Sequence, residues 1–297
     1  MILSIDIRAT TILARIWKWL LFHSFFVVTV YFLMKYLHVN ISMATIISMI
    51  GIVLSILMGF RISSAYDRWW EARKIWGAVV NDSRTLARQL ITFTSTAAID
   101  PVHLQGMVHR HIAFVYAMAG RLRHQNTTEQ IKPFVFEDEW HSLANRGHQP
   151  NLLLLHNLYA FKKMEADGLV SNFEFLALDG TMQRLTDSLG AAERIKNTPF
   201  PVPYSYFTSF LVHVFATMLP FGIIEVFGYI AIPIAISVIF IFLTIEQIAI
   251  EIQDPFANKE NDIPVTAISQ AIEIDLKEML GDRDLPQKDN AKNGVLM

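Results

Sequence analysis

One uninterrupted stretch, from Ile52 to Gly77, constrains this chain more than any other. It reads IVLSILMGFRISSAYDRWWEARKIWG. The first part is apolar and suits a lipid bilayer, whereas the second part is charged, rich in tryptophan and suits water. Because no proline and no loop-like cluster separates the two parts, we expect one helix to cross a membrane surface and continue beyond it.

Two lines of side chains run along the apolar part of this expected helix. Ile52, Ile56 and Phe60 recur every fourth residue and therefore share one face. A neighbouring line of small residues lets other helices approach closely; it consists of Ala44, Ser48, Gly51, Ser55 and Gly59. The spacing predicts a packed assembly. It leaves open whether the large apolar line faces lipid or protein core, or has a function of its own.

The composition requires both a membrane part and a part in water. Of the 297 residues, 53% are hydrophobic and 18% are charged, which is too apolar for most soluble domains and too charged for a fully embedded chain. The net charge of −2 gives no basis for nucleic-acid binding. The sequence has no cysteine, so disulfides, thiolate metal sites and cysteine nucleophiles are excluded.

The expected fold class is an all-α integral membrane protein with four transmembrane helices, each long enough for a bilayer core of about 30 Å. The helices form two hairpins with water-exposed helical segments around them. The segments are an interfacial amphipathic segment at 1–18, transmembrane helices 1 and 2 within 19–62, a cytosolic helical region at 63–203, transmembrane helices 3 and 4 within 204–250, a cytosolic loop and helix at 251–280, and a disordered tail at 281–297.

Periodicity also predicts the shorter elements and the orientation. Helices are expected over 101–121, 151–166, 171–197 and 265–280, whereas 137–150 resembles a loop. Two prolines inside apolar runs, Pro220 and Pro233, predict kinks. Basic residues lie at both ends of the first hairpin, which places those ends in the cytoplasm; they are Arg8, Arg15, Lys18, Arg61, Arg68, Arg73 and Lys74.

The sequence does not support an enzyme. It lacks a glycine-rich phosphate loop, a G-x-S-x-G motif and a pair of carboxylates placed for hydrolysis. The histidines between the two hairpins fit no metal-ligand spacing and are expected at the surface; they are His103, His109, His111, His124, His141, His148 and His156. We expect no charge pair within the spans, which argues against a transporter; the residues considered are His23, Lys35, His213 and Glu246.

One loop carries oxygen ligands of the kind that calcium binds. They are Asp254, Asn258, Glu260 and Asp262. The loop lacks the glycine and the terminal glutamate of an EF-hand, and Lys259 lies within it. It is either a weak calcium site or a solvated loop, and no cofactor is expected.

Three blocks of sequence resemble the bestrophin family in its bacterial form. The first contains Arg61, AYDRWWEARK at 65–74, WG at 76–77 and NDSR at 81–84. The second contains ERI at 193–195 with TP at 198–199 and Pro201, and the third contains DPF at 254–256 with NDIP at 261–264. The blocks lie in the family order with membrane spans between them, and the resemblance covers most of the chain from about residue 20 to 280.

The resemblance implies a homopentameric ion channel with a central pore. In this family the second transmembrane helix lines a narrow neck, and the neck positions correspond to Ile52, Ile56 and Phe60. A tube of apolar walls offers ions no ligands and gates by dewetting. Within the first block, Arg68 to Glu71 and Glu71 to Lys74 are i,i+3 pairs on a helix, and we expect the tryptophan rings to fill contacts between subunits.

The resemblance also implies a second constriction, or aperture, near the cytosolic exit. Counting from Gly168 places it at Glu174, or at Phe173 if the alignment shifts by one residue. Other family members have an apolar residue there, so a ring of five Glu174 carboxylates would favour cations. Ser171-x-x-Glu174 is equally the pattern of a capping box, in which Glu174 satisfies its own helix terminus.

The resemblance leaves several functional points open. The chain lacks the unbroken acidic run of the calcium-binding loop in animal bestrophins, so we expect calcium-free gating. The permeant ion is an anion such as chloride or a cation such as sodium. The bacterial-type motif indicates an inner (plasma) membrane, with lipid and identical subunits as partners and both termini in the cytoplasm. The alternative is a membrane-anchored helical scaffold or regulatory protein without conduction.

Overall fold

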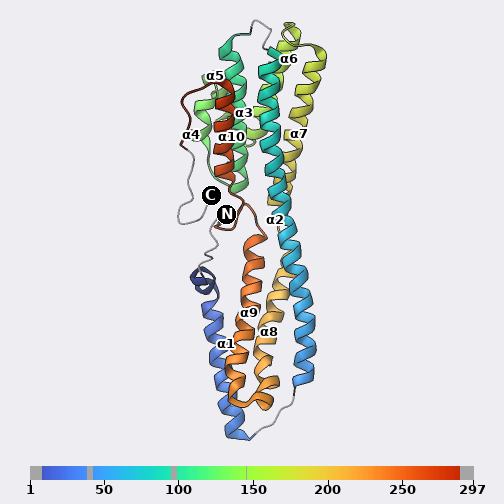
Figure 1. The fold of residues 1–297 in the computed structure, drawn as a ribbon, viewed down its shortest axis with the longest axis vertical. Coiled ribbons are helices and arrows are strands. Elements are labelled where there is room, and N and C mark those ends of the chain that lie inside the picture. The colour runs from blue at the N-terminus through green and yellow to red at the C-terminus, as the bar shows by residue number, and fades with distance from the viewer. Residues whose placement is uncertain (1–8, 39–42, 95–98, 145, 288–297) are drawn as a thin grey trace. The chain divides into compact units, whose positions relative to one another are not determined.

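The computed structural model describes residues 9–38, 43–94, 99–144 and 146–287. Within these residues every regular element is a helix. The helices are α1 (Ala9–Leu37), α2 (Ala44–Thr94), α3 (Pro101–Arg123), α4 (Thr128–Ile131), α5 (Glu137–Leu143), α6 (Gln149–Ala166), α7 (Asn172–Asn197), α8 (Val202–Phe227), α9 (Ala231–Ile252) and α10 (Val265–Leu280), with short 3₁₀ turns η1 (Lys132–Phe134) and η2 (Gly228–Ile230) (Figure 1).

The chain divides into two compact units. The membrane unit contains the described residues of Ser4–Trp69 and Pro199–Asp254, and the extramembrane unit contains Trp70–Thr198 and the described residues from Pro255 onward. The predicted continuous helix is confirmed, because α2 runs from Ala44 to Thr94 without a break. Its first part belongs to the membrane unit and its second part to the extramembrane unit.

Three described stretches are long and apolar enough to cross a membrane. They are Ile12–Leu37, Ala44–Thr94 and Val202–Ile252. The last stretch holds both α8 and α9. The short turn η2 separates them, and its first residue, Gly228, adopts φ 55°. The stretches therefore contain the four helices α1, α2, α8 and α9, which match the four predicted spans.

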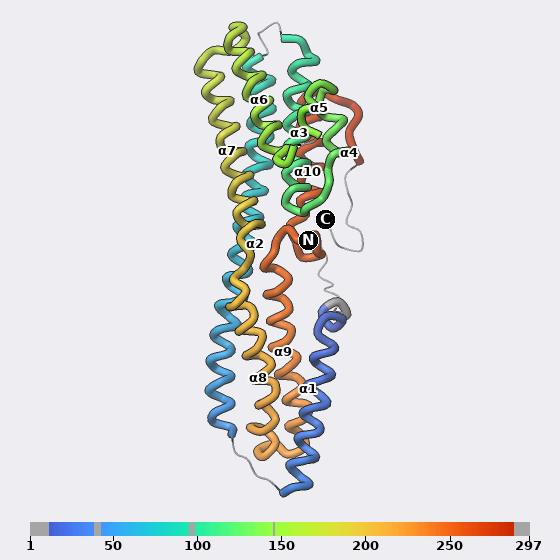
Figure 2. Tube along the Cα trace, turned by 180° about the vertical axis from the view of Figure 1, so that it is seen from behind, coloured from blue at the N-terminus to red at the C-terminus, as the bar shows by residue number. Residues whose placement is uncertain are grey.

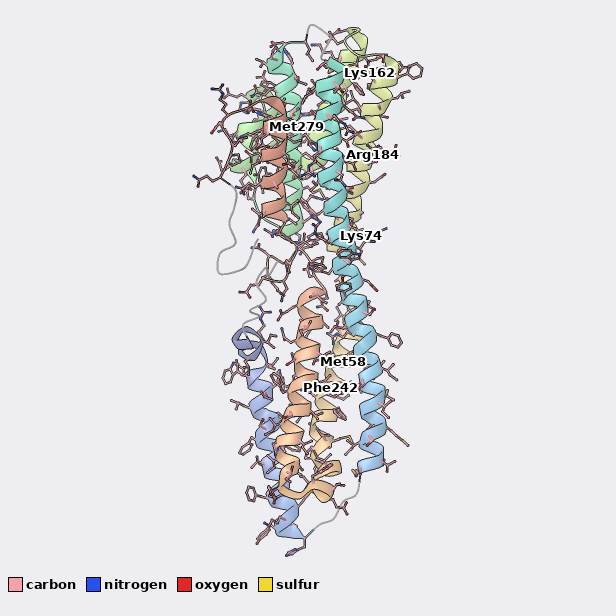
Figure 3. All side chains as sticks on the ribbon, viewed as in Figure 1. Met58, Lys74, Lys162, Arg184, Phe242 and Met279 are labelled. Carbon is pink, nitrogen blue, oxygen red and sulfur yellow. The ribbon has the colours of Figure 1, made fainter. Side chains whose placement is uncertain are left out.

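The core of the membrane unit is almost entirely aliphatic and aromatic. Figure 2 shows α1, α8 and α9 side by side, and these three helices pack closely on one another. Met58 of α2 is buried in this core, and Phe242 of α9 packs against the core (Figure 3). The Phe242 and Phe215 rings pack in a T-shaped arrangement, with 5.1 Å between their centroids. Such contacts hold the helices together without directional bonds.

Two predictions about the membrane unit need adjustment. The described part of the predicted interfacial segment is continuous with the first span, because α1 begins at Ala9 and ends at Leu37. The kink predicted at Pro233 assumes that this residue lies inside a helix. That assumption is wrong, because Pro233 lies in the first turn of α9. The missing N–H of a proline there would have had no partner within the helix. Pro220 does lie inside α8.

The helices of the extramembrane unit begin and end where their capping residues require. Asp100 accepts a hydrogen bond from the Val102 N–H (2.9 Å) at the start of α3, and Pro101 follows it. At the end of α10, Gly281 adopts φ 79°, a conformation that glycine tolerates best. The helices predicted over 101–121, 151–166, 171–197 and 265–280 are confirmed as α3, α6, α7 and α10.

Two other predictions about this unit are wrong. Residues 137–150 do not form a loop, since α5 occupies Glu137–Leu143 and α6 begins at Gln149. His111 is not a surface residue; it is 1% exposed, and its Nε2 lies 2.8 Å from the Ser83 hydroxyl. Burial lowers the pKa of His111 to about 3, so the imidazole is neutral. Most of the predicted tail, residues 288–297, lies outside the described residues.

Candidate functional site

The predicted neck residues lie together on one face of α2. Ile52, Ile56 and Phe60 are 62%, 55% and 64% exposed, whereas Leu54 and Met58 on the opposite face are buried. We call Ile52, Ile56 and Phe60 the neck face. The chain's own core therefore uses one side of α2 and leaves three large apolar side chains of the other side without cover. Such a face is available for lipid or for other copies of the chain.

The stripe of small residues beside the neck face serves two purposes. Gly51 packs on α8, because a methyl group placed there would lie 3.2 Å from the Phe215 ring. Ser48 and Ser55 are exposed and donate hydrogen bonds to the carbonyls of Ala44 and Gly51 within α2. Gly59 is exposed and faces open space. One part of the stripe thus brings α2 against α8, and the other part borders the exposed face.

A buried ion pair lies directly behind the neck face. Arg61, the residue after Phe60, is 1% exposed and points into the membrane unit. Its Nη1 lies 3.4 Å from Glu246 Oε1 of α9 and donates a hydrogen bond of 3.2 Å to the Ser205 carbonyl of α8. The expectation that the spans hold no charge pair is wrong, because Arg61 was assigned to the membrane-water boundary when in fact it turns inward.

A second polar contact in the membrane unit was also missed. His23 of α1 is buried, and its Nε2 lies 3.0 Å from Nδ1 of His213 on α8. The Trp19 ring packs on the His213 ring at 4.3 Å between centroids. The sequence contained a signal for this pair, since each histidine is isolated in an apolar span and a buried imidazole needs a hydrogen-bond partner.

The predicted aperture residues lie in the first turn of α7. Phe173 is 85% exposed. Glu174 completes a capping box: its Oε2 accepts hydrogen bonds of 2.7 Å from the N–H and the hydroxyl of Ser171, and its own N–H donates to the Ser171 hydroxyl (3.3 Å). These hydrogen bonds lower the pKa of Glu174 below its ordinary value. The capping role is confirmed, and it leaves a charged carboxylate at the helix terminus.

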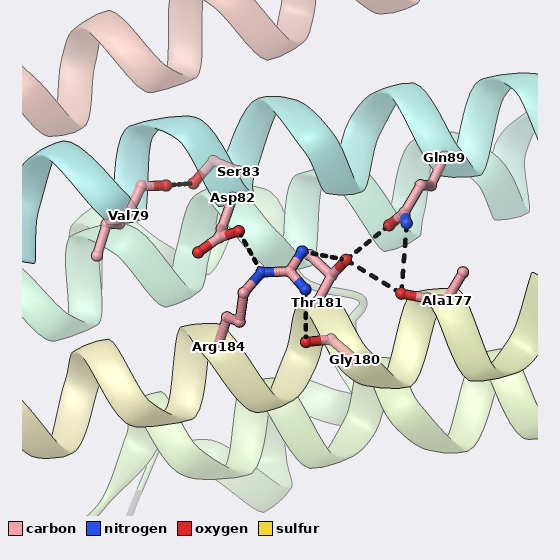
Figure 4. A network of polar contacts seen from close by, with 8 residues as sticks. All are labelled: Val79, Asp82, Ser83, Gln89, Ala177, Gly180, Thr181 and Arg184. Carbon is pink, nitrogen blue, oxygen red and sulfur yellow. Dashed lines mark hydrogen bonds and ion pairs between the residues drawn. The ribbon is translucent and has the colours of Figure 1, made fainter.

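A network of polar contacts fixes α7 on the second part of α2 (Figure 4). The guanidinium of Arg184 pairs with Asp82, with 2.8 Å between Nε and Oδ1. The Thr181 hydroxyl lies 2.8 Å from Gln89 Oε1, and the Gln89 amide donates to the Ala177 carbonyl (3.3 Å). The helix that carries the predicted aperture, α7, is therefore held on α2 by Arg184 with Asp82 at one end of this network and by Gln89 with Ala177 at the other.

The aromatic block after the neck is partly a core element of the chain itself. Trp76 is fully buried, so it does not fill a contact between subunits as expected, whereas Trp70 is 47% exposed. The predicted pair of Glu71 and Lys74 is confirmed at 2.5 Å. Arg68 interacts electrostatically with Asp254 of the same unit. The tryptophans of this block therefore have different surroundings despite their similar sequence context.

The calcium candidates are not brought together as a metal centre. Among the described residues, no group of three or more histidine and carboxylate side chains is close enough to hold a metal ion. Asp262 is buried and accepts a hydrogen bond from the Lys259 N–H (3.0 Å). Arg123 donates to the Thr266 hydroxyl (2.6 Å), and its charge attracts Asp262. A guanidinium of the chain thus neutralises the carboxylate of this loop.

Comparison with known proteins places these features in one family. The family model for bacterial and fungal bestrophin proteins matches residues 2–278. The chain is 30% identical over 260 residues to a voltage-dependent anion channel-forming protein of Ralstonia nicotianae, covering 87% of this chain and 84% of that protein. It is also 30% identical over 281 residues to the voltage-dependent anion channel-forming protein YneE of Escherichia coli K12, covering 94% and 91%.

The fold is likewise similar to solved structures. A crystal structure of a bacterial bestrophin homologue from Klebsiella pneumoniae superposes with a TM-score of 0.83 at 26% identity. The match covers 89% of this chain and 98% of that one. The resemblance read from three sequence blocks therefore extends to the whole fold.

Proposed function

The chain belongs to the bacterial and fungal bestrophin family, and from that premise we propose that it forms a passive channel for small monovalent ions. Five copies surround a common axis, and α2 of each copy lines a hydrophobic neck with Ile52, Ile56 and Phe60. The neck face carries the proposal, because these side chains are more than half exposed on a helix whose opposite side is buried.

Lipid contact alone accounts for exposed apolar side chains, so the residues beside them matter. Ser48, Ser55 and Gly59 border the neck face and are exposed in the single chain. Small residues at this position allow the α2 helices of neighbouring copies to approach closely. A surface that faces only lipid has no need for small residues, which favours neighbouring protein over lipid.

The proposed neck has the chemistry of a gate rather than of a selectivity filter. Its walls carry neither charges nor hydrogen-bonding groups, so an ion in a narrow neck loses water without gaining ligands. Small changes in neck diameter then decide whether water and ions fill it. The discrimination between anions and cations has to come from another part of the pore.

Glu174 is the side chain we assign to that discrimination. A ring of five carboxylates at the aperture favours cations, whereas the two relatives described above are named anion channel-forming proteins. The charge of Glu174 is available for this role, because a lowered pKa keeps the carboxylate ionised at neutral pH. The capping box supplies the orientation of the same side chain.

The test of Glu174 is the substitution Glu174→Gln, with reversal potentials measured in a gradient of sodium chloride. We expect the cation-to-anion permeability ratio to fall severalfold. Because the pKa is lowered, the ratio of the unaltered protein should stay constant from neutral to mildly acidic pH and fall only as the pH drops through that lowered pKa. An unchanged ratio in the variant would remove Glu174 from selectivity.

The proposed location is a bacterial inner membrane with both termini in the cytoplasm. Basic residues lie at the N-terminal end of the first span, at Arg8, Arg15 and Lys18, and follow the apolar part of α2, as the positive-inside rule requires for that orientation. The test of the channel itself is ion flux from liposomes that contain the purified protein, with the particle mass measured in detergent. Pentamers without flux of chloride or sodium would leave the scaffold alternative, and monomers would exclude the proposed pore.

A further inference from the structure

The buried face of α2 in the membrane unit is apolar except at one position. Ile47, Leu54, Met58 and Ala65 are buried there, and the charged residue among the buried positions is Arg61. Apolar contacts are not directional, so a seam of this kind tolerates some rotation or sliding of the helix. A single buried polar group in such a seam specifies rotation and register, as it does in coiled coils.

The contacts of α2 with α8 are close near the start of α2. A methyl group on Gly51 would lie 3.2 Å from the Phe215 ring of α8, and one on Gly222 of α8 would lie 3.5 Å from Ala44 Cα. Farther along α2, Tyr204 of α8 reaches the Leu57 carbonyl at 3.5 Å, the limit of a hydrogen bond. Beside the neck face, Arg61 holds α2 by directional contacts, through its ion pair with Glu246 and its hydrogen bond to the Ser205 carbonyl.

Arg61 and Phe60 are consecutive, so they lie about 100° apart around the helix axis. When the guanidinium is held inside the unit, the Phe60 ring is directed outward, where it is 64% exposed. Any rotation of α2 would move the neck face relative to the other copies and would at the same time break the geometry at Glu246.

We propose that Arg61 is the positioning residue of the neck: its pairing with Glu246 and Ser205 fixes the rotation of α2, so that Ile52, Ile56 and Phe60 face the axis. The proposal rests on the proposed channel function. Arg61 itself touches no permeant ion, because it lies on the buried side of α2.

Single cysteines on α2 measure this rotation directly, because the chain has no cysteine of its own. Ile56→Cys lies in the middle of the exposed face, and Val53→Cys and Ser55→Cys lie on its two edges. The readout is the rate at which a charged thiol reagent blocks ion flux from liposomes. With the ion pair intact, we expect the reagent to block Ile56→Cys about tenfold faster than either edge variant, the ratio that corresponds to ~1.4 kcal/mol.

The deciding experiment repeats these cysteine measurements in a protein that also carries the double substitution Arg61→Met with Glu246→Leu. Replacing both members of a buried ion pair by apolar residues is often neutral or stabilising, so pentamers should form and the stability should hold. We expect the tenfold preference for Ile56→Cys to fall to about threefold or less, because an apolar seam no longer specifies one rotation. A purely structural role of the pair would leave this preference unchanged.

The control is a second ion pair of the membrane unit, Arg15 with Glu251, which joins α1 to α9 and does not involve α2. Arg15→Gln with Glu251→Gln should retain the tenfold preference. If the Arg61→Met, Glu246→Leu protein forms no pentamers, Arg61→Lys answers the same question: lysine keeps the charge but loses the fork of donors, so the preference should fall.

The outcomes separate the two proposals. An undiminished preference in assembled Arg61→Met, Glu246→Leu pentamers, or in Arg61→Lys, would overturn the positioning role and leave the channel proposal standing. If Ile56→Cys is blocked no faster than Val53→Cys and Ser55→Cys while the ion pair is intact, the neck assignment itself is wrong.

Discussion

The two units of this chain hold their helices together in different ways. In the extramembrane unit, ion pairs and hydrogen bonds join many helix pairs: Arg84 with Asp275, Arg184 with Asp82, and Arg110 with Glu139. In the membrane unit the core is aliphatic and aromatic. Polar links between helices also occur among its described residues, and the pair of Arg61 with Glu246 on the buried side of α2 lies next to the proposed neck.

The difference teaches where each unit is sensitive to substitution. Loss of an exposed polar link in the extramembrane unit, such as Arg184 with Asp82, leaves the others, and water is available to the freed groups. Loss of a polar group in the membrane unit leaves its partner in an apolar core, where no solvent replaces it. We therefore expect the same kind of substitution to have large effects in one unit and small effects in the other.

The largest expected effect comes from breaking the Arg61 ion pair on one side. Glu246→Ala leaves the buried guanidinium without its carboxylate and should destabilise the membrane unit by about 3–5 kcal/mol. The measurement is thermal unfolding of the purified protein in detergent. Glu251→Ala is the matched control, because its partner Arg15 is 32% exposed and reaches water, so the loss should be about 1 kcal/mol or less. Both carboxylates belong to the membrane unit, so equal losses in the two variants would contradict the claim that burial of the arginine partner sets the size of the loss.

An intermediate effect is expected where helices approach through a glycine. In Gly222→Ala the added methyl group would lie 2.7 Å from Ile47 Cδ1, and Ile47 is buried in the core. Overpacking of this kind should cost about 1–2 kcal/mol. In the extramembrane unit, Gly106→Ala places a methyl group 2.5 Å from the Phe136 ring, but Phe136 is 45% exposed and can turn aside.

The Gly106→Ala protein should therefore unfold at nearly the same temperature as the unaltered protein. Alanine also favours a helix over glycine by about 0.5–1 kcal/mol, which offsets the displacement of the ring. If Gly106→Ala proves more destabilising than Gly222→Ala, the cores of the two units do not differ in the way proposed.

A small effect is expected from the network between α2 and α7. The Arg184 side chain is 51% exposed, so Arg184→Ala should cost about 0.5 kcal/mol, which is typical of an exposed ion pair. Thr181 and Gln89 retain their hydrogen bonds and keep α7 in place. Hydrogen exchange of α7 amides measures the outcome, and protection lost along the whole helix would show that the network is not redundant.

The smallest effect, none, is expected from removal of calcium. Arg123 already supplies a positive charge to the buried Asp262, one of the predicted calcium ligands. Flux from liposomes should be the same in a calcium chelator as in added calcium. A chelator that abolishes flux, with restoration by calcium, would show that the loop holds the ion after all.

Periodicity along the chain predicted what depends on neighbours in sequence. The spacing of Ile52, Ile56 and Phe60 placed these residues on one face, and their shared exposure confirms that arrangement. The capping box of Ser171 and Glu174 was likewise predictable, because the two residues are only three positions apart in the sequence. The sequence also indicated the continuous helix α2, because nothing in it interrupts the helical pattern.

Contacts between residues distant in sequence were harder to predict. Arg61 and Glu246 are 185 residues apart, and a basic residue after an apolar run ordinarily indicates the membrane surface. A histidine between polar neighbours in sequence ordinarily indicates the surface, but His111 is buried and its Nε2 contacts the Ser83 hydroxyl inside the core. The role proposed for the exposed neck face depends on other copies of the chain, and a single sequence carries no direct record of them.

The most direct test of the central claim is the block of ion flux by a charged thiol reagent at Ile56→Cys, compared with Phe25→Cys. Both positions are exposed and apolar on membrane helices, at 55% and 75%, but only the first belongs to the neck face. The account predicts that reagent added to liposomes stops flux through Ile56→Cys and leaves flux through Phe25→Cys unchanged. Flux that persists through a fully modified Ile56→Cys protein would contradict it.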